Sequence, residues 1–468
     1  MSDLAFLSIA RLTGLIDQGA LDPVALARLY LDRAEGVGRP LNAFVLLCRD
    51  TALAEAAAAA QRARARRRLG PLDGVPIAIK DNIDVAGVPT SNGFGGAPWR
   101  VPMQDAEVVR RLRAAGAVIL GKLNMHEGAL GATNDNPHLG RAINPHRAGF
   151  TPGGSSGGSG VAVAAGLCAA ALGTDTGGSV RLPAAYCGVV GLKPSYGLVS
   201  TRGVVPLSYR LDHVGPLART VEDAALMLHA MAGLDPDCPE SRAGAPPPAV
   251  AASASLDGVR LGVLRNVDDD PPEPAVAASF RAACARLGRL GAVLETVELP
   301  TYDMVRGRRA GFVRVEVEAA FVHGALYQRE PARFSAEMRG FLEFGARASA
   351  QLLLQADRRI ALAAFELARC FDRVDAVLSP TAPQVAFAFD RPPPANQGGY
   401  TILANFAGCP AISLPMGATP DGLPTGLHVM APVGREDRVL AVASAYEAAA
   451  GWQLAPPPPY GPPPYVPP

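Results

Sequence analysis

The sequence predicts an α/β protein, and one stretch of strand, helix and strand carries most of that prediction. The β-branched run 75–80 is typical of a buried strand, and it ends at Lys80. An amphipathic helix, which we expect Asp105 to cap, is followed directly by a second strand at 117–120. The chain has 468 residues, 49% of them hydrophobic, so it is long enough to bury a large core.

Other segments continue the alternation of helix and strand. We expect a helix from a Thr51 cap to Gly70, and a mostly helical block over 306–370. Further helices are predicted at 22–35, 158–170, through Ala184 and Ala185, at 275–289 and at 436–450. Further strands are predicted at 170–174, 259–264, 293–297 and 376–378. The segment 234–255, rich in Pro, Ala, Asp and Ser, is predicted to be a surface connection.

Charge and cysteine content bound the possible partners and compartment. The 44 basic and 43 acidic side chains nearly cancel, and basic residues cluster only at the helix end 62–68, so we expect no nucleic-acid partner. Seven scattered cysteines without CxxC spacing indicate reduced thiols in a cytoplasmic protein. The N-terminus does not resemble a signal peptide, and the apolar stretch 161–172 is too short to span a membrane.

Two Gly/Ser turns are the least ordinary parts of the chain: GFTPGGSSGGSG at 149–160 and TGGS at 176–179. A flexible linker is a poor interpretation, because strong helix and strand patterns adjoin both turns. Neither turn is closed by the Lys of a phosphate-binding loop. Glycine also allows backbone to approach a substrate closely, so two such turns that each present Ser indicate a nucleophile and its partner.

A serine nucleophile needs a base, and the residues alone leave that base open. His126 and His213 lie in polar, loop-like settings, but no pattern marks either as a triad base. Lys80 is the other candidate, because an amine at the end of a buried strand loses hydration and its pKa falls. The alternative for Lys80 is a structural salt bridge with Asp81 or Asp84.

The segment PGGSSGGSGVAVAAGLCAAALGTDTGGSVRLPAAYCGVVGLKPSYG resembles the signature of the amidase signature family, as do GVPIAIKDNI and NPHRAGFTPGGSS. The likeness runs from about residue 20 to 230 and resumes at DAVLSPTAP, NFAGCPAISLPMG and GLPTGLHVM. It implies one large domain over 1–468, with a central, mixed, twisted β-sheet surrounded by α-helices. The signature core would occupy about 70–230, a variable helical pocket region about 300–370, and a Pro-rich tail 455–468.

The resemblance also implies a set of functional residues. Lys80 matches the catalytic lysine, Ser155 the bridging serine behind a cis peptide at Gly154, and Ser179 the nucleophile. The implied oxyanion hole consists of the backbone N–H groups of Thr176, Gly177, Gly178 and Ser179, and the implied supporting residues are Ser156, Asp175 and Arg181. The family's chemistry needs neither a metal nor an organic cofactor.

The predicted function is therefore hydrolysis of a small-molecule amide by a Ser-Ser-Lys relay, in a monomer or homodimer. A carbamate or ester hydrolase on the same triad is one alternative. Another is the glutamine-hydrolysing subunit of a tRNA-dependent amidotransferase. Relatives of that kind typically carry Asp seven residues before the Asn of ANLAGLP. Here Asn405 stands in ANFAGCP and the matching position is Gly398, which argues against glutamine.

The substrate pocket is the least determined part of the prediction. Phe334, Met338 and Phe341 fall at helical spacing, which suits a pocket for an apolar or aryl amide but equally suits a helix face packed in the core. Met125 and His126 follow a strand that leads towards the predicted site, so they are further candidates for the pocket wall.

Overall fold

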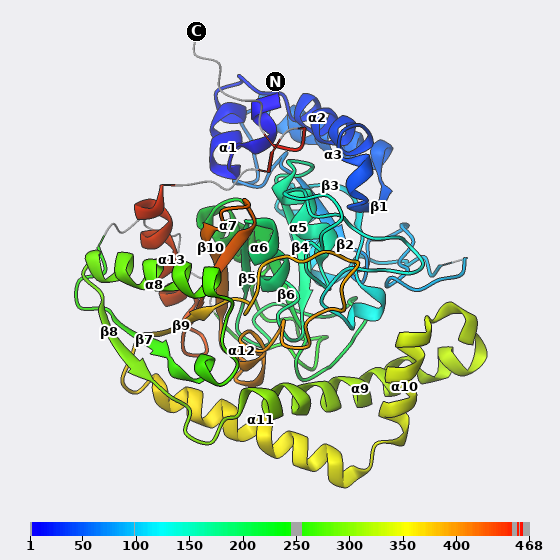
Figure 1. Ribbon diagram of the computed structural model, residues 1–468. Helices are drawn as coiled ribbons and strands as arrows, with labels where there is room; N and C mark the ends of the chain where they lie inside the picture. The colour runs from blue at the N-terminus through cyan, green and yellow to red at the C-terminus, as the bar shows by residue number, and fades with distance from the viewer. Residues whose placement is uncertain (1, 98, 245–254, 452–455, 458, 462–468) are drawn as a thin grey trace.

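The computed structural model describes residues 2–97, 99–244, 255–451, 456–457 and 459–461. Within these ranges an 11-stranded sheet crosses the whole molecule, in the order β1-β3-β2-β4-β6-β5-β10-β11-β9-β7-β8 (Figure 1). The strands are β1 (Phe44–Leu47), β2 (Pro76–Lys80), β3 (Val118–Leu123), β4 (Ala170–Asp175), β5 (Val190–Lys193), β6 (His213–Ala218), β7 (Arg260–Leu264), β8 (Val293–Val297), β9 (Ala376–Pro380), β10 (Ala411–Ala418) and β11 (Pro424–Met430).

The sheet is mixed, as predicted. Strand β2 runs parallel to β3 and β4, and β7 runs parallel to β8 and β9. The other neighbouring strands pair antiparallel. Every residue of β2, β3, β4 and β6 is buried, because helices or loops cover both faces of the sheet there. The predicted single α/β domain is confirmed.

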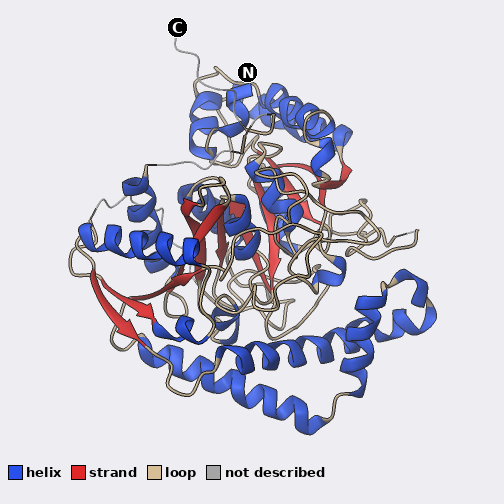
Figure 2. Cartoon of the chain, in the orientation of Figure 1, coloured by secondary structure: helices blue, strands red, loops and turns tan. Residues whose placement is uncertain are grey.

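Helices surround the sheet on all sides (Figure 2). They are α1 (Ile9–Asp17), α2 (Pro23–Glu35), α3 (Arg49–Arg64), α4 (Glu107–Ala114), α5 (Gly157–Ala164), α6 (Arg181–Cys187), α7 (Val221–Met231), α8 (Pro274–Arg289), α9 (Met304–Arg329), α10 (Ala336–Arg347), α11 (Ala350–Cys370), α12 (Ile402–Phe406) and α13 (Glu436–Ala450). Short 3-10 helices lie at Ser2–Phe6, Arg39–Leu41, Glu127–Ala129, Arg265–Asp269 and Pro331–Arg333. The N-terminal helices α1, α2 and α3 group at one end of the molecule (Figure 1).

The long helices α9, α10 and α11 form a separate layer along one edge of the domain (Figure 1). This layer is the predicted helical block over 306–370, and α9 packs against both other helices. A second hydrophobic core lies beneath it, and Met125, Tyr400 and Ile402 belong to that core. Loops from the sheet and helices from the variable region therefore share one apolar interior.

Two predicted helix starts are wrong. Thr51 does not cap α3, which begins at Arg49; the Thr51 hydroxyl donates instead to the Cys48 carbonyl from inside the first turn, at 3.0 Å. Asp105 does not cap α4 either, because its carboxylate accepts the Ala86 N–H from a different loop, at 2.8 Å. Helix ends also differ, since α3 stops at Arg64 before the left-handed residue Arg66 (φ 54°) rather than continuing to Gly70.

Other boundaries agree with the sequence or lie outside the described residues. Strand β8 and helix α13 have the predicted ends, whereas α5 stops at Ala164, six residues early. Residues 245–254 of the predicted connection, and most of the Pro-rich tail, lie outside the described residues. In the described part of the tail, Tyr460 packs against the main core and its carbonyl accepts a hydrogen bond from Arg33. No helix of the described ranges is both long and apolar enough to cross a bilayer.

Candidate active site

Three segments distant in the sequence meet at the carboxyl ends of β2 and β4. Lys80 is the last residue of β2 and Ser155 lies just before α5. Ser179 lies in the turn between β4 and α6. Because β2 and β4 are adjacent and parallel, their carboxyl ends lie at the same edge of the sheet, and the three predicted catalytic residues lie there together.

Lys80 faces hydroxyl groups rather than carboxylates. Its Nζ atom lies 2.7 Å from Ser155 Oγ and 2.8 Å from Thr174 Oγ1, and the side chain is fully buried. The neighbouring acids have other partners: Asp81 pairs with Lys122 at 2.9 Å, and Asp84 pairs with Arg100 at 2.6 Å. The salt-bridge alternative for Lys80 is therefore wrong for the described chain.

The environment of Lys80 favours its neutral form. Burial lowers the pKa of Lys80 to about 7, against the opposing effect of the charges on Asp212 and Asp175. A substantial fraction of the amine is then unprotonated at neutral pH. Such an amine can accept a proton from the hydroxyl that it already contacts.

The two serine turns are tied together by the backbone. The Gly154–Ser155 peptide is cis, as the resemblance implied, and the Ser155 carbonyl accepts the His126 N–H at 3.0 Å. The Ser156 N–H donates to the Ser179 carbonyl at 3.3 Å, and Ser156 Oγ lies 3.2 Å from the Thr174 carbonyl. Ser156 thus joins both turns to β4.

The two predicted catalytic serines differ in exposure and in their contacts. Ser155 is buried, whereas Ser179 is half-buried and so reachable by a substrate. Among the described residues, the Ser179 hydroxyl shares no hydrogen bond with Ser155. Proton transfer between the two serines therefore stays a prediction.

The turn 176–179 presents backbone donors to the space beside Ser179. Within the described chain, the N–H groups of Thr176, Gly177 and Ser179 have no hydrogen-bond acceptor. The fourth predicted donor differs, because the Gly178 N–H donates to Asp175 Oδ1 at 2.8 Å. Gly178 instead has a steric role: its φ is 134°, and a Cβ atom there would lie 2.2 Å from Thr401 Oγ1.

A buried ion pair fixes this turn from behind. The guanidinium N–H donors of Arg181 contact both oxygens of Asp175, the Thr401 carbonyl, the Asn405 side-chain oxygen and His428 Nε2, all at 2.7–3.0 Å. Burial alone would raise the pKa of Asp175, but Arg181 and the Asn405 amide hold it well below its usual range. Both members are fully buried, and Asp175 passes the constraint on to the Gly178 and Val180 N–H groups.

Sequence reasoning missed several of these partners. Thr174 contacts Lys80, and Asn405 contacts both Asp175 and Arg181. The segment ANFAGCP carries no local pattern that would place Asn405 against the nucleophile turn. A clue to Thr174 was available in GTDTGGS, because strand alternation places Thr174 and Thr176 on the same face.

The two histidine candidates for the base have other environments. Burial, assisted by the charge on Lys80, lowers the pKa of His126 to about 4. His213 Nδ1 lies 2.7 Å from the Leu211 carbonyl, its ring packs edge-on against Tyr196, and burial lowers its pKa well below the ordinary value. Both rings are therefore neutral near pH 7.

The predicted pocket residues are placed near the site to different degrees. The His126 ring fills the space beside Gly131, where an added Cβ would lie 2.1 Å from Nε2. Met125 is fully buried and Phe341, on α10, is half-buried; both pack in the second core. The core interpretation is thus satisfied for Met125 and Phe341, and their part in a substrate pocket stays a prediction.

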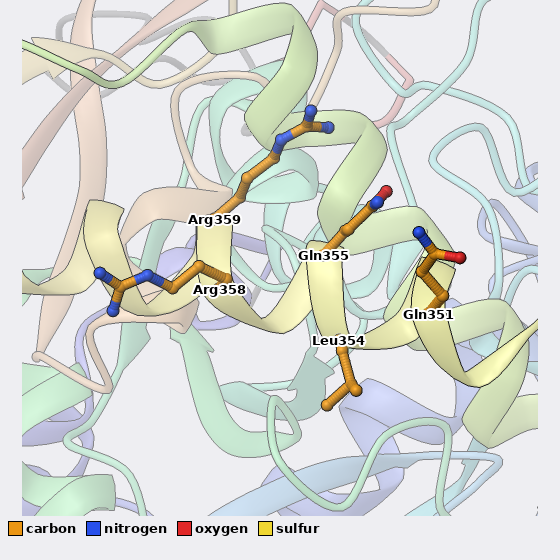
Figure 3. Close-up of a pocket in the computed structure, with 5 residues that line it drawn as sticks. All are labelled: Gln351, Leu354, Gln355, Arg358 and Arg359. Carbon is orange, nitrogen blue, oxygen red and sulfur yellow. The ribbon is translucent and has the colours of Figure 1, made fainter.

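A separate hollow of about 560 Å³ lies over the outer face of α11 (Figure 3). Its lining residues all come from that one helix: Gln351, Leu354, Gln355, Arg358 and Arg359. None of the predicted site residues lines it, so the hollow does not belong to the serine–lysine site.

Comparison with known proteins agrees with this geometry. The family model named Amidase matches residues 25–440. The chain belongs to the amidase signature family. Among curated relatives of this amidase, a subunit of the glutamyl-tRNA(Gln) amidotransferase of Methylococcus capsulatus is 38% identical over 480 residues, covering 96% of the chain and 98% of the relative.

Solved structures of family members superpose closely on this amidase. One is described as an unexpected vestigial protein complex that reveals the evolutionary origins of an s-triazine catabolic enzyme; it has a TM-score of 0.89 and 34% identity, covering 96% of this chain and all of that one. Another is the peptide amidase of Stenotrophomonas maltophilia, with a TM-score of 0.84 and 31% identity, covering 97% and 99% of the two chains. The chain is thus an enzyme of the amide-hydrolysing class.

The comparisons correct the expected partners of this amidase. We expected a monomer or homodimer that meets a small amide and no nucleic acid. The curated relatives are instead named as one subunit of a glutamyl-tRNA(Gln) amidotransferase. A balanced net charge excludes a strongly basic surface, but it carries no information about a partner subunit or about a nucleic acid held elsewhere in an assembly.

Proposed function

We propose that this amidase hydrolyses the C–N bond of a small amide with Ser179 as nucleophile, Ser155 as proton relay and Lys80 as base. The observation that carries the proposal is the contact of Lys80 Nζ with Ser155 Oγ at 2.7 Å, in a buried pocket where no carboxylate pairs with Lys80 within the described chain. A serine hydroxyl is a poor nucleophile without an adjacent base, and this lysine supplies one.

The proposed acylation balances its protons through the relay. Neutral Lys80 accepts the Ser155 proton while Ser155 accepts the Ser179 proton, and the Ser179 oxygen attacks the carbonyl carbon. The Lys80 proton then returns through Ser155 to the leaving nitrogen, the C–N bond breaks, and ammonia or an amine departs. Water attacks the resulting ester by the same route, which restores Ser179 and releases the acid.

The turn 176–179 would stabilise the negative charge that develops on the carbonyl oxygen. The unsatisfied N–H groups of Thr176, Gly177 and Ser179 support this role. A single preorganised donor of this kind typically contributes about 3–4 kcal/mol to the transition state. The Gly178 N–H, already donated to Asp175, is left out of the proposed oxyanion hole.

The favoured setting is the glutamine-hydrolysing subunit of a tRNA-dependent amidotransferase complex. In support, the curated relatives with this name align with more than nine-tenths of the chain at 36–38% identity. The s-triazine-related neighbour, which is likewise described as a protein complex, also favours a subunit that works with a protein partner.

One observation favours a second candidate, in which the substrate is a different small amide, a carbamate or an ester. A Cβ atom at Gly398 would lie 3.2 Å from the Gly177 carbonyl, so this position borders the proposed oxyanion turn and offers no carboxylate for the ammonium group of glutamine. The Asp270 carboxylate, near Gly399, is already occupied by Arg308 at 3.0 Å and by Asn396 at 2.9 Å.

Purified enzyme separates these possibilities. Hydrolysis of glutamine, aryl anilides, short aliphatic amides and aryl carbamates would be measured for wild type, Ser179→Ala and Lys80→Ala. The same assays would be repeated with the other subunits of a tRNA-dependent amidotransferase added. Ser349→Ala, which removes a hydroxyl from the start of α11, is the matched control and should keep wild-type activity.

The outcomes are distinct. Glutamine turnover that appears with the added subunits supports the favoured setting, whereas turnover of another amide by the isolated chain supports the second candidate. Ser179→Ala and Lys80→Ala should each lose at least about 1,000-fold in kcat, because relay residues act as a unit. Activity retained by Ser179→Ala would overturn the proposed mechanism in both settings.

A further inference from the structure

Asp212, which the proposed relay does not use, holds the first residue of the oxyanion turn. Its Oδ1 atom accepts the Thr176 hydroxyl at 2.6 Å. Its Oδ2 atom accepts the N–H groups of Leu207 and Ser208, at 2.8 and 3.0 Å. Both carboxylate oxygens are therefore fixed, one of them by a side chain of the turn.

The register of the sheet produces this contact. Asp175, at the end of β4, pairs with His213, at the start of antiparallel β6. Continuing that ladder by one residue places Thr176 opposite Asp212. Side chains alternate along a strand, so Thr174, which contacts Lys80, and Thr176, which contacts Asp212, point to the same face about 7 Å apart.

The charge on Asp212 is not cancelled locally. Within the described chain no Arg, Lys or His forms an ion pair with Asp212, whereas the other carboxylate near Lys80, Asp175, is paired with Arg181. Asp212 is only 9% exposed, but it borders a cavity of about 170 Å³ shared with Tyr209 and Asp237. A space of that volume can admit several waters, which makes an unpaired carboxylate tolerable there.

We propose that Asp212 is a positioning residue of this hydrolase: it holds Thr176 and thereby the oxyanion turn, and it places an uncompensated negative charge on the face of β4 that carries Lys80. The inference rests on the proposed Lys80–Ser155–Ser179 relay. Its effect on the base has a defined direction, because a nearby anion favours the protonated amine. Asp212 thus opposes the loss of basicity that burial imposes on Lys80.

The charged groups around Lys80 are few. Asp212 exerts the larger attractive effect on the amine and Asp175 the smaller one. His126 is the remaining titratable neighbour, and it is neutral over the working range because burial lowers its pKa to about 4. Burial raises the pKa of Asp212 to about 6, so Asp212 is ionised across most of the range in which Lys80 titrates.

Sulfonylation by phenylmethylsulfonyl fluoride tests the proposal without a known substrate. The Ser179 oxygen displaces fluoride from sulfur and its proton passes to the relay, so the rate, followed by intact mass, reports the activated serine. For Asp212→Asn we expect the acidic limb of the pH–rate profile to move down by about one pH unit, as expected for removing a charge about 7 Å away in a medium of intermediate dielectric. Asp237→Asn, on the same cavity, should leave the limb in place.

The hydrogen bond to Thr176 has its own test. Thr176→Val should slow sulfonylation about tenfold without moving the limb, and Thr176→Ser, which keeps the hydroxyl, should recover most of that loss. A limb that stays in place in folded Asp212→Asn, or a wild-type rate in Thr176→Val, overturns the proposal. If Asp212→Asn fails to fold, the Thr176 pair decides it. Ser179→Ala labelled as fast as wild type would instead refute the relay itself.

Discussion

Replacement of Lys80 by methionine should inactivate the enzyme and yet relieve a thermodynamic burden on the fold. Lys80 is fully buried, its Nζ contacts only hydroxyls among hydrogen-bonding groups, and burial lowers its pKa from the ordinary 10.5 to about 7. The unfolded chain therefore binds a proton at Lys80 that the folded protein holds poorly. Methionine keeps the length of the side chain without this titration.

The size and sign of the effect follow from linkage. A depressed pKa in the folded state means that stability is complete above pH 10.5 and is lost as pH falls towards 7. The full loss corresponds to at most about 5 kcal/mol. Between pH 9.5 and pH 7, the advantage of Lys80→Met over wild type should grow by about 3 kcal/mol.

Denaturant unfolding of wild type and Lys80→Met between pH 7 and 9.5 measures this difference. Loss of the contacts with Ser155 and Thr174 shifts the mutant by a constant amount, so the slope of the difference against pH is the diagnostic quantity. Titrations elsewhere in the protein cancel between the two chains.

A difference that stays flat with pH would refute the depressed pKa of Lys80, and with it the reason for a neutral base. Lys122→Met is the matched control, because Lys122 is equally buried but lies 2.9 Å from Asp81. Removing that partner leaves a buried carboxylate, so this variant should lose about 3–5 kcal/mol instead of gaining stability.

Three further outcomes follow from the site. Arg181→Lys should cost about 3 kcal/mol or more of stability, measured by denaturant midpoint, because one ammonium cannot replace five donors in fixed directions; a midpoint equal to wild type contradicts the network. Gly178→Ala should lower kcat/KM at least about 100-fold, since its Cβ would meet Thr401 and displace the oxyanion turn; near-normal kinetics would show that the turn adapts. In wild type, kcat/KM should rise with pH around 7 as Lys80 deprotonates, and His126→Asn should leave that midpoint in place; its loss in the variant would identify His126 as the base.

Local patterns were enough to predict the architecture and the backbone of the site. The run that ends at Lys80 became the buried strand β2, and the segments after it alternate between helix and strand as expected. The Gly/Ser turns flank buried elements on both sides, so the positions of Ser155 and Ser179 followed from short-range signals. The resemblance to a family supplied the roles of these residues.

Long-range pairing explains what the sequence could not supply. Asp81 is adjacent to Lys80 in the chain, but successive strand residues point to opposite faces, and the β2–β3 pairing brings Lys122 to Asp81 instead. The contacts of Arg181 with Thr401 and Asn405 span more than 200 residues. Partner subunits leave no periodic pattern in a chain, which is why the expectation of an independent enzyme was wrong.

The pillar formed by Arg181 ties the timing of activity to the order of synthesis. Lys80, Ser155 and Ser179 all leave the ribosome within the first 180 residues, but three groups that grip Arg181 belong to Thr401, Asn405 and His428. Until those residues emerge, the nascent chain carries its complete set of reactive groups with an unsupported turn behind the nucleophile. Catalytic competence therefore arrives only near the end of translation, when about nine-tenths of the polypeptide has been made, and a prematurely terminated product is a harmless one.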